Sequence, residues 1–519
     1  MKSLIKGLSL ALLGGLLLSA CGGGSSGSSS PALSVATSLS FGSQTVGSPS
    51  TKALTVTNTG TATLVITSVT VTGVSFTQDN ACTNVAPGAS CTINVTYTPP
   101  DATAQTGSLS IVSNAPHSPA SVALSGAAGL TNFLPVSVSV GPLTDYYSVN
   151  VLYTTITLCT HGSTTACSTI PNIQVDTGSV GLRLISPLPT GSAVPTPIID
   201  PTTTSPIFEC VQFVDGYTWG SMVTFDIQFG GQTLSNVAVN LMGDAAAGTA
   251  PDDCGTPPAG STLTAGPGYP NESTLSMLGV NGILGVGNFL QDCETFCTPS
   301  YLANHSQYLS DSPYYVCPTT CVHTGVATQS QANNLVALLD TDNNGILLDL
   351  PSALAAGQES LDGKIYLGVN TQANNQIPSS AKIYSLSYYG TLSTTYNSDV
   401  LPYSFIDSGS NGLYFNDLSI DQCADLAYQF YCPASTLDLS AVIQNSDATV
   451  TSDAIHFSIG NADSLLPLST PTPLTVLPTL GGPLSQAASF DWGLPFFYGR
   501  KVFVLLDSNA GYANGAIAF

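Results

Sequence analysis

An eight-residue peptide occurs twice in this 519-residue chain. Residues 175–182 read Val-Asp-Thr-Gly-Ser-Val-Gly-Leu, and residues 406–413 read Ile-Asp-Ser-Gly-Ser-Asn-Gly-Leu. An apolar residue leads into each copy as a buried strand, and the glycines permit a tight turn that presents the aspartate at a fixed place. One such turn is an ordinary loop, but two copies predict a fold in which both carboxylates meet in one site.

The repeated aspartates, Asp176 and Asp407, indicate acid–base chemistry on a water molecule. Two carboxylates at short range cannot both be ionised cheaply, so such a pair shares one proton. One group then serves as a base and the other as an acid near the same water. The hydroxyls beside them can bond the backbone or the neighbouring turn.

The composition is typical of a β-rich chain with two or three domains. Only 8% of the residues are charged, Thr, Ser, Val, Gly and Tyr are abundant, and long helical periodicities are hard to find, which favours sheets. Eight Lys and Arg against 31 Asp and Glu give a net charge of −23. This balance argues against nucleic acid or anionic lipid as a partner surface.

The first twenty residues are expected to be a signal peptide. Lys2 and Lys6 precede an apolar run over 8–18 and the small residues Ser19 and Ala20. The sequence Leu-Ser-Ala-Cys at 18–21 resembles a bacterial lipobox, which implies cleavage before Cys21 and acylation of that cysteine. A Gly/Ser-rich tether follows over 21–32. The mature chain is therefore expected to be exported and lipid-anchored to a bacterial membrane, at the outer membrane or cell surface.

The cysteines indicate disulfides in an oxidising compartment. Removing Cys21 from the thirteen leaves an even number, twelve. Three short-range pairs and one longer pair are expected: Cys82 with Cys91, Cys159 with Cys167, Cys423 with Cys432, and Cys210 with Cys254. The remaining four form two C-x3-C pairs, for which a structural zinc site is the alternative to disulfides: Cys293, Cys297, Cys317 and Cys321.

Residues 33–126 predict an Ig-like β-sandwich. Short runs of alternating apolar and polar residues, broken by turn residues, give about seven strands at the spacing of such domains. The segment resembles bacterial modules related to the ASH domains of cilium and spindle proteins, through Phe41-Gly42, Val46-Gly47 and Val-Thr-Asn-Thr-Gly at 56–60. Its polar side chains form no cluster that suggests chemistry, so a spacer or binding module is expected.

Residues 132–519 resemble the pepsin-like aspartic proteases at several points in the right order. The resemblance implies a bilobal double β-barrel, with a first lobe over about 132–355 and a second over about 360–519. The chain end, 502–519, looks like the closing strands of the second lobe. A closer match is to an exported bacterial family that shares Val-Asp-Thr-Gly-Ser-x-Gly-Leu-Arg and Gly-Tyr-Thr-Trp-Gly-Ser.

The same resemblance implies roles for single residues. Asp176 and Asp407 would hold the attacking water between them. The residues around them would lock the two loops together, permit close approach or hydrogen-bond the carboxylates: Thr177, Gly178, Ser179, Ser408, Gly409 and Ser410. The segment 211–239 is similar to the flap hairpin, with Tyr217 over the cleft and Trp219 beside it as substrate-facing residues. No cofactor and no metal is expected.

The sequence departs from the pepsin pattern at three places. The flap has Thr218-Trp219 where pepsins usually have Gly-Thr. Arg183 stands where many carry a tryptophan, and a cation within about 6 Å of the pair would hold a carboxylate ionised; a structural ion pair is the alternative. The strand expected to thread beneath the second loop, Asp491-Trp492-Gly493, has an acid where an apolar residue is expected.

The sequence has no H-E-x-x-H and no P-loop. The acidic stretch 340–345 begins like a calcium loop but is expected to be a turn. The leading hypothesis is an aspartic-type endopeptidase of the cell envelope that acts on polypeptides and contacts the membrane through the lipid at Cys21. The alternatives are a non-catalytic pepsin-like protein that binds a polypeptide or cell-wall polymer, and an envelope adhesion or scaffold protein.

Overall fold

The computed structural model describes residues 29–45, 49–99, 104–129, 132–143, 146–188, 191–257, 269–424, 430–466, 473–484, 486, 488–507 and 511–519. The expected signal peptide and lipid-bearing Cys21 lie outside the described residues. The chain divides into two compact units, Met1–Gly129 and Leu130–Phe519. Within the described residues, no helix combines the length and apolar character that a membrane span requires.

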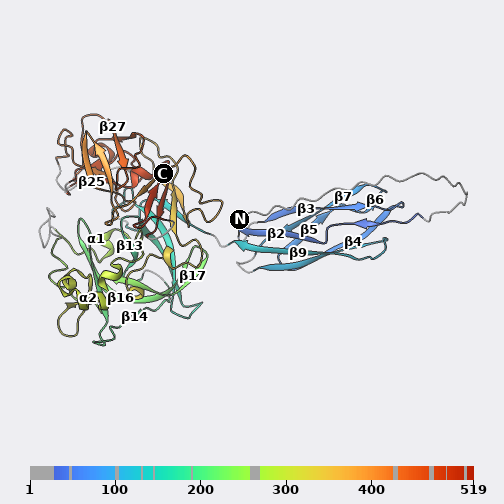
Figure 1. The fold of residues 1–519 in the computed structure, drawn as a ribbon, viewed down its shortest axis with the longest axis horizontal. Coiled ribbons are helices and arrows are strands. Elements are labelled where there is room, and N and C mark those ends of the chain that lie inside the picture. The colour runs from blue at the N-terminus through green and yellow to red at the C-terminus, as the bar shows by residue number, and fades with distance from the viewer. Residues whose placement is uncertain are drawn as a thin grey trace, which may run out of the picture. The chain divides into compact units, whose positions relative to one another are not determined.

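The smaller unit is a sandwich of two sheets (Figure 1). One sheet has the order β1-β3-β7-β5 and the other β2-β9-β8-β4-β6. Alternate residues of β3 and β7 point inward, and the rings of Phe41, Phe76 and Tyr97 pack together in the core. The strands are β1 (Leu33–Ser34), β2 (Ser38–Thr45), β3 (Ser50–Asn58), β4 (Leu64–Thr72), β5 (Phe76–Asn80), β6 (Asn84–Val85), β7 (Ser90–Tyr97), β8 (Gln105–Ser113) and β9 (Ala120–Gly129).

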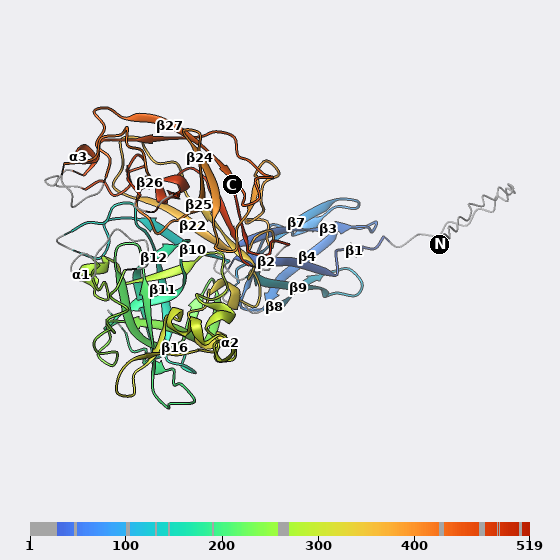
Figure 2. The same cartoon turned by 60° about the vertical axis from the view of Figure 1, so that its left-hand side comes forward.

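The larger unit has two lobes, the first drawn in cyan and green and the second in orange and red, with β10 and β22 between them (Figure 2). Its main sheet runs β20-β19-β15-β16-β17-β13-β18-β12-β11-β10-β22-β21-β31-β32-β23, with β14 beside β16. The strands are β10 (Phe133–Val138), β11 (Leu152–Cys159), β12 (Cys167–Asp176), β13 (Val180–Ile185), β14 (Thr196–Pro197), β15 (Ile207–Gln212), β16 (Tyr217–Phe229), β17 (Gln232–Met242), β18 (Gly282–Val286), β19 (Tyr314–Val316), β20 (Val322–His323), β21 (Gly345–Asp349), β22 (Leu361–Leu367), β23 (Ile383–Ser385), β31 (Lys501–Leu505) and β32 (Ala516–Ala518).

The second lobe is built on a smaller sheet with the order β28-β27-β24-β25-β30-β26-β29. Its strands are β24 (Leu392–Tyr396), β25 (Asp399–Ile406), β26 (Leu413–Phe415), β27 (Leu437–Gln444), β28 (Ile455–Ile459), β29 (Gly481–Gly482) and β30 (Phe490–Trp492). The helices are short: α1 (Leu275–Leu278), α2 (Pro299–Asn304), α3 (Ala462–Leu465), η1 (Glu294–Cys297), η2 (Ser306–Asp311), η3 (Thr328–Ser330), η4 (Val336–Leu338) and η5 (Leu494–Phe497). The expected all-β class, a sandwich followed by a two-lobed β domain, is confirmed.

The two lobes repeat one strand arrangement around the duplicated turns. In the first lobe, β18 runs parallel to β12 and antiparallel to β13, which is parallel to β17. In the second, β30 runs parallel to β25 and antiparallel to β26, which is parallel to β29. Asp491-Trp492 therefore does thread beneath the second loop, and the residue of β18 that matches Asp491 is Ile283, because Val175 pairs with Leu284 as Ile406 pairs with Trp492.

The chain end belongs to the main sheet, where β32 pairs with β31 and with β23, both within 360–519, and β31 also pairs with β21. The C-x3-C cysteines form a disulfide within each pair, so the zinc alternative does not hold. The described residues hold six disulfides, including the four expected pairs: Cys82–Cys91, Cys159–Cys167, Cys210–Cys254, Cys293–Cys297, Cys317–Cys321 and Cys423–Cys432. These disulfides indicate an exported protein.

Candidate active site

The two duplicated turns are bonded to each other through a pair of buried hydroxyls. Ser408 Oγ accepts a hydrogen bond from the Thr177 N–H at 3.1 Å and donates to the Val175 carbonyl at 2.9 Å. Thr177 Oγ1 accepts from the Ser408 N–H at 2.9 Å and donates to the Ile406 carbonyl at 3.0 Å. Each hydroxyl thus satisfies one donor and one acceptor of the opposite turn, which holds the lobes in a single register.

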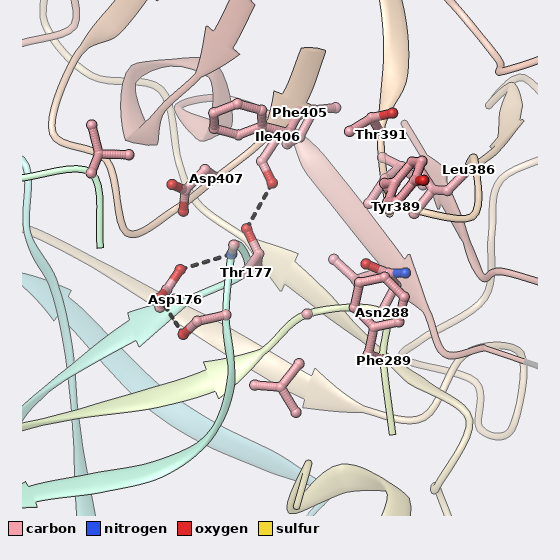
Figure 3. A pocket seen from close by; sticks show the side chains of 18 of the residues that line it. Asp176, Thr177, Asn288, Phe289, Leu386, Tyr389, Thr391, Phe405, Ile406 and Asp407 are labelled. Atoms are coloured by element: carbon pink, nitrogen blue, oxygen red, sulfur yellow. Dashed lines mark hydrogen bonds between the residues drawn. The ribbon is translucent and has the colours of Figure 1, made fainter. Parts of the chain in front are cut away.

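Each aspartate is held in the same way by its own turn. Asp176 Oδ1 accepts from the Gly178 N–H at 2.7 Å, and its Oδ2 accepts from the Ser179 hydroxyl. Asp407 Oδ1 accepts from the Gly409 N–H at 2.7 Å, and its Oδ2 accepts from the Ser410 hydroxyl at 2.9 Å. The two carboxyl groups therefore present equivalent faces toward one another (Figure 3).

The glycines of the turns are required because each lies under the opposite carboxyl group. A Cβ atom on Gly178 would lie 2.8 Å from Asp407 Cγ, and one on Gly409 would lie 2.6 Å from Asp176 Oδ1. Both distances are too short for a side chain, so any other residue would push the carboxyl groups apart. Glycine thus sets the close approach of the two aspartates.

Burial and the closeness of Asp176 change the titration of Asp407. Burial raises the pKa of Asp407 to about 8, and the charge of Asp176 and a hydrogen bond with it act in the same direction. The Gly409 N–H and the Ser410 hydroxyl, which stabilise the anion, oppose this rise. A carboxyl group with this pKa keeps its proton at neutral pH.

A cavity of about 600 Å³ opens over both aspartates and is lined by both lobes. Its wall is mainly apolar, with Tyr389, Thr391 and Asn288 adding polar atoms in Figure 3. The turn between β15 and β16 contributes Phe213 and Val214. The apolar part of the wall is formed by Phe289, Leu386, Phe405, Val504 and Ile517.

The part of the β15–β16 hairpin that lines this cavity is its tip. Trp219 is only 2% exposed and packs between Phe208 and Tyr315, with its indole N–H bonded to the Ala247 carbonyl at 3.0 Å. Tyr217 stacks on Tyr269. Neither is among the described residues that line the cavity, which instead receives the hairpin tip, Gln212 to Val214. The sequence feature that indicates a role for the tip is a pair of consecutive apolar residues in a turn, Phe213 and Val214.

Arg183 forms a structural ion pair and does not act on the aspartate pair. The residue is 1% exposed, and its Nη2 lies 2.9 Å from Glu209 Oε1 and 3.4 Å from Asp292 Oδ2. Tyr314 donates its hydroxyl to Asp292 Oδ1 at 2.7 Å. The arginine therefore belongs to a buried ion cluster of the first lobe.

Removing the Thr177 hydroxyl while keeping the size of the side chain is expected to weaken the hydrogen bonds that join the two turns. Thr177→Val leaves the Ser408 N–H and the Ile406 carbonyl buried without partners, which should lower the free energy of unfolding by about 2–4 kcal/mol. Thr177→Ser retains both bonds and should cost about 1 kcal/mol for the lost methyl group. Urea unfolding followed by tryptophan fluorescence compares the two variants. Equal losses would mean that the hydroxyl contributes nothing beyond packing.

Two lobes joined through paired acidic turns define this unit as a bilobal β scaffold with one aspartate pair. The chain belongs to the family described as "Protein of unknown function (DUF3443)", whose model matches residues 128–519. Residues 28–120 match the model of the ASH module, described as "Abnormal spindle-like microcephaly-assoc'd, ASPM-SPD-2-Hydin". No curated protein matches the chain.

Two solved structures are similar to parts of the chain. An aspartic proteinase from Irpex lacteus is 13% identical with a TM-score of 0.40, and the match covers 74% of this chain and 96% of that protein. A protein of unknown function from Porphyromonas gingivalis W83 is 20% identical with a TM-score of 0.19. That match covers 20% of this chain and half of the other protein's length.

Proposed function

We propose that this protein is an aspartic-type endopeptidase of the bacterial cell envelope, in which Asp176 and Asp407 activate one water molecule. The observation that carries the proposal is the placement of each carboxyl group over the glycine of the opposite turn, beneath a cavity open to a substrate. The raised pKa of Asp407, about 8, supports an acid and a base side by side from acidic to neutral pH.

The chemistry follows from the shared proton. The ionised member of the pair takes a proton from the water molecule as its oxygen attacks the scissile carbonyl carbon. The protonated member donates its proton to the carbonyl oxygen, and proton return to the amide nitrogen releases the two peptides. The roles of acid and base belong to the pair as a unit. This mechanism forms no bond between enzyme and substrate.

The cavity supports an extended polypeptide as substrate. Its apolar wall suits hydrophobic side chains on either side of the cleaved bond, and the hairpin tip at Phe213 and Val214 supplies a cover from one side. Export in a disulfide-stabilised form and attachment through a lipid on Cys21 would place the enzyme at the outer membrane or cell surface.

Binding of a polypeptide without hydrolysis is the second candidate. It is favoured by the position of Tyr217, which stacks on Tyr269 and is not among the described residues that line the cavity. A pepsin-like enzyme is expected to have a flap tyrosine over its cleft. In a protein that binds without hydrolysis, the aspartate pair would serve only to hold the peptide backbone.

Proteolysis is tested by incubating the full-length chain, made in an oxidising compartment, with a reduced and alkylated protein from pH 3 to 7. Mass spectrometry in H₂¹⁸O is expected to find new C-termini that carry one ¹⁸O atom, and hydroxylamine is expected to trap no acyl intermediate. A double variant, Asp176→Asn with Asp407→Asn, serves as the control for contaminating proteases. Folded protein that retains the substrate on a column but never cuts it would support the binding alternative instead.

A further inference from the structure

Six aromatic rings lead away from the cavity across the larger unit, each in contact with the next. The centroids of successive rings are 5.2, 6.1, 5.3, 4.1 and 6.5 Å apart. The row is therefore at most about 27 Å long, which is the span of about eight residues of extended chain. These residues, called the aromatic row below, are in order Tyr389, Tyr388, Phe296, Tyr301, His305 and Tyr308.

The row begins in the wall of the cavity, at a turn of the second lobe that precedes β24. Tyr389 lines the cavity (Figure 3). The Gly390 N–H donates to the Ser387 carbonyl at 2.9 Å and closes the turn. Gly390 also lies so close to Asn288 and Phe289 that a Cβ atom on it would be 3.0 Å from a side-chain atom of each. The turn is thus packed against the first lobe, which fixes the place of its tyrosines.

The rest of the row lies on the short helices η1, α2 and η2 of the first lobe. Phe296 in η1 packs edge to face against Tyr388, so the row passes from one lobe to the other at this contact. The disulfide Cys293–Cys297 closes the loop that carries Phe296. Tyr301 of α2 and His305, which caps that helix, stack with an angle of 14° between their rings.

Most rings of the row are exposed although each has a ring to pack against. Tyr389 is 74% exposed, Tyr388 56%, Tyr308 47% and Phe296 40%. Contiguous exposed apolar surface marks a place where another molecule binds. Tyrosine is favoured on binding surfaces, because its large ring has few rotamers to lose and its hydroxyl tolerates water. These properties indicate that the row binds a ligand.

We propose that the aromatic row is a docking surface for the part of an extended polypeptide substrate that lies outside the cavity. This inference rests on the proposed function, because it extends the cleft over the two aspartates to a second site for the same substrate chain. The first support is continuity, since Tyr389 belongs both to the cavity wall and to the row.

The orientation of the rings is the second support for a polypeptide. The first three ring pairs of the row meet at 82°, 88° and 80°. The rings therefore face different directions, with recesses between them, and do not form one flat platform. Such recesses take separate side chains of an extended peptide. A polymer of sugar rings that stacks on aromatic faces would need rings that face the same way.

The charge beside the row predicts which side chains it accepts. Glu294 lies in the same short helix as Phe296, and no basic side chain of the described residues forms an ion pair with it. Partial burial and the charge of Glu294 raise the pKa of the Tyr388 phenol. A lysine or arginine of the substrate can therefore meet a carboxyl group and the faces of aromatic rings in one place. Acidic side chains are repelled by the net charge of −23.

Binding is measured without cleavage, in the full-length chain that carries Asp176→Asn and Asp407→Asn. The probe is a fluorescein-labelled peptide of about 20 residues, in which Tyr, Leu and Lys alternate with Gly and Ser, and the readout is fluorescence anisotropy at pH 7. Adding Phe296→Ala with Tyr308→Ala should raise Kd about tenfold. Tyr146→Ala is the control, since Tyr146 is 76% exposed and lies outside both the row and the cavity lining, and it should leave Kd unchanged.

An unchanged Kd in the row variant would overturn the docking surface. If that variant does not fold, Tyr308→Ala alone decides, because this ring contacts only His305 among the described rings. It should raise Kd about threefold. Purified peptidoglycan glycan strands are tested as competitors. Displacement of the peptide from the row by glycan at lower concentration than by unlabelled peptide would assign the row to a cell-wall polymer and refute the proposal.

A second peptide, with Glu in place of each Lys, tests the charge preference. It should bind at least about tenfold more weakly than the Lys peptide, and Glu294→Gln should narrow this difference. The Gln side chain keeps the size of Glu and removes only the charge. Equal affinities of the two peptides for the unaltered row would contradict the predicted preference for basic side chains.

Cleavage by the chain with both aspartates separates this inference from the proposed function. A peptide of about six residues occupies only the cavity, whereas one of about 20 residues also reaches the row. Phe296→Ala with Tyr308→Ala should raise KM for the long peptide about tenfold, with kcat and the constants of the short peptide unchanged. A chain that binds through the row but cuts neither peptide would refute the endopeptidase alone. Equal changes in KM for both peptides would refute the docking surface alone.

Discussion

Asn in place of either Asp176 or Asp407 is expected to lower kcat/KM for a peptide substrate by about 10²- to 10⁴-fold, the range of a single general acid–base group. The amide has the shape of the carboxyl group and still accepts the N–H of Gly178 or Gly409, so the turns should keep their structure. It cannot take a proton from water, and it cannot share one with its partner. Loss of either member therefore removes the function of both.

The measurement is the initial rate of cleavage of a fluorogenic peptide from pH 3 to 7. Asp226→Asn is the matched control, since Asp226 is also a buried aspartate of the first lobe but pairs with His161 at 2.8 Å and lies outside the cavity lining. That variant should lose stability and keep its turnover. Full activity in either catalytic-pair variant would disprove a shared-carboxylate mechanism, whatever the substrate.

Replacing Arg183 by Met is expected to have the largest effect on stability, a fall in the free energy of unfolding of about 3–5 kcal/mol at pH 7. The guanidinium is the cation between Glu209 and Asp292, and Glu209 is fully buried. Methionine fills the space but leaves buried acid groups with no counter-charge. Water cannot reach them to replace the lost interaction.

The same cluster predicts how this loss depends on pH. Burial and Glu209 raise the pKa of Asp292 well above its ordinary value. A carboxyl group with a raised folded-state pKa stabilises the fold fully below its unfolded pKa, and this contribution is lost as the pH rises through the folded value. At pH 4 the Asp292 carboxyl group is neutral and needs no cation. The deficit of Arg183→Met should therefore be smaller at pH 4 than at pH 7.

Tryptophan fluorescence during urea unfolding suits this test, because both tryptophans of the chain, Trp219 and Trp492, are in the larger unit. Lys501→Met is the control, since it removes an exposed ion pair with Asp349 at 3.4 Å and should cost less than about 1 kcal/mol. A loss for Arg183→Met no greater than that of the control at pH 7 would show that the cluster is not held by its arginine.

Local patterns in the chain were sufficient for much of the fold and the core of the site. The repeat of Asp176 and Asp407 predicted the meeting of two acidic turns, since the two peptides share their aspartate and both glycines and so form similar turns. Cysteines eight or nine residues apart predicted their own disulfides. Alternation of apolar and polar residues was enough to recognise the sandwich.

Other placements depend on partners that lie on different strands or far away in the chain. Trp219 packs against Phe208 and Tyr315 in the hairpin core. Arg183 meets Asp292, 109 residues later. Likewise, β31 could be assigned to the main sheet only from its pairing with β21. The pattern of apolar residues in a strand predicts which face of the strand is buried. It does not predict which other strand pairs with it in the sheet.

By itself, therefore, the sequence determined the all-β class, the export-type disulfides and the identity of the two aspartates, because each depends on residue type and short spacing. Only the tertiary structure decided which groups tune those aspartates. The Thr177 and Ser408 hydroxyls each bond the opposite turn, and the cavity wall joins side chains of both lobes. Such neighbours are created when the strands pack, since burial and charge act through space and not along the chain.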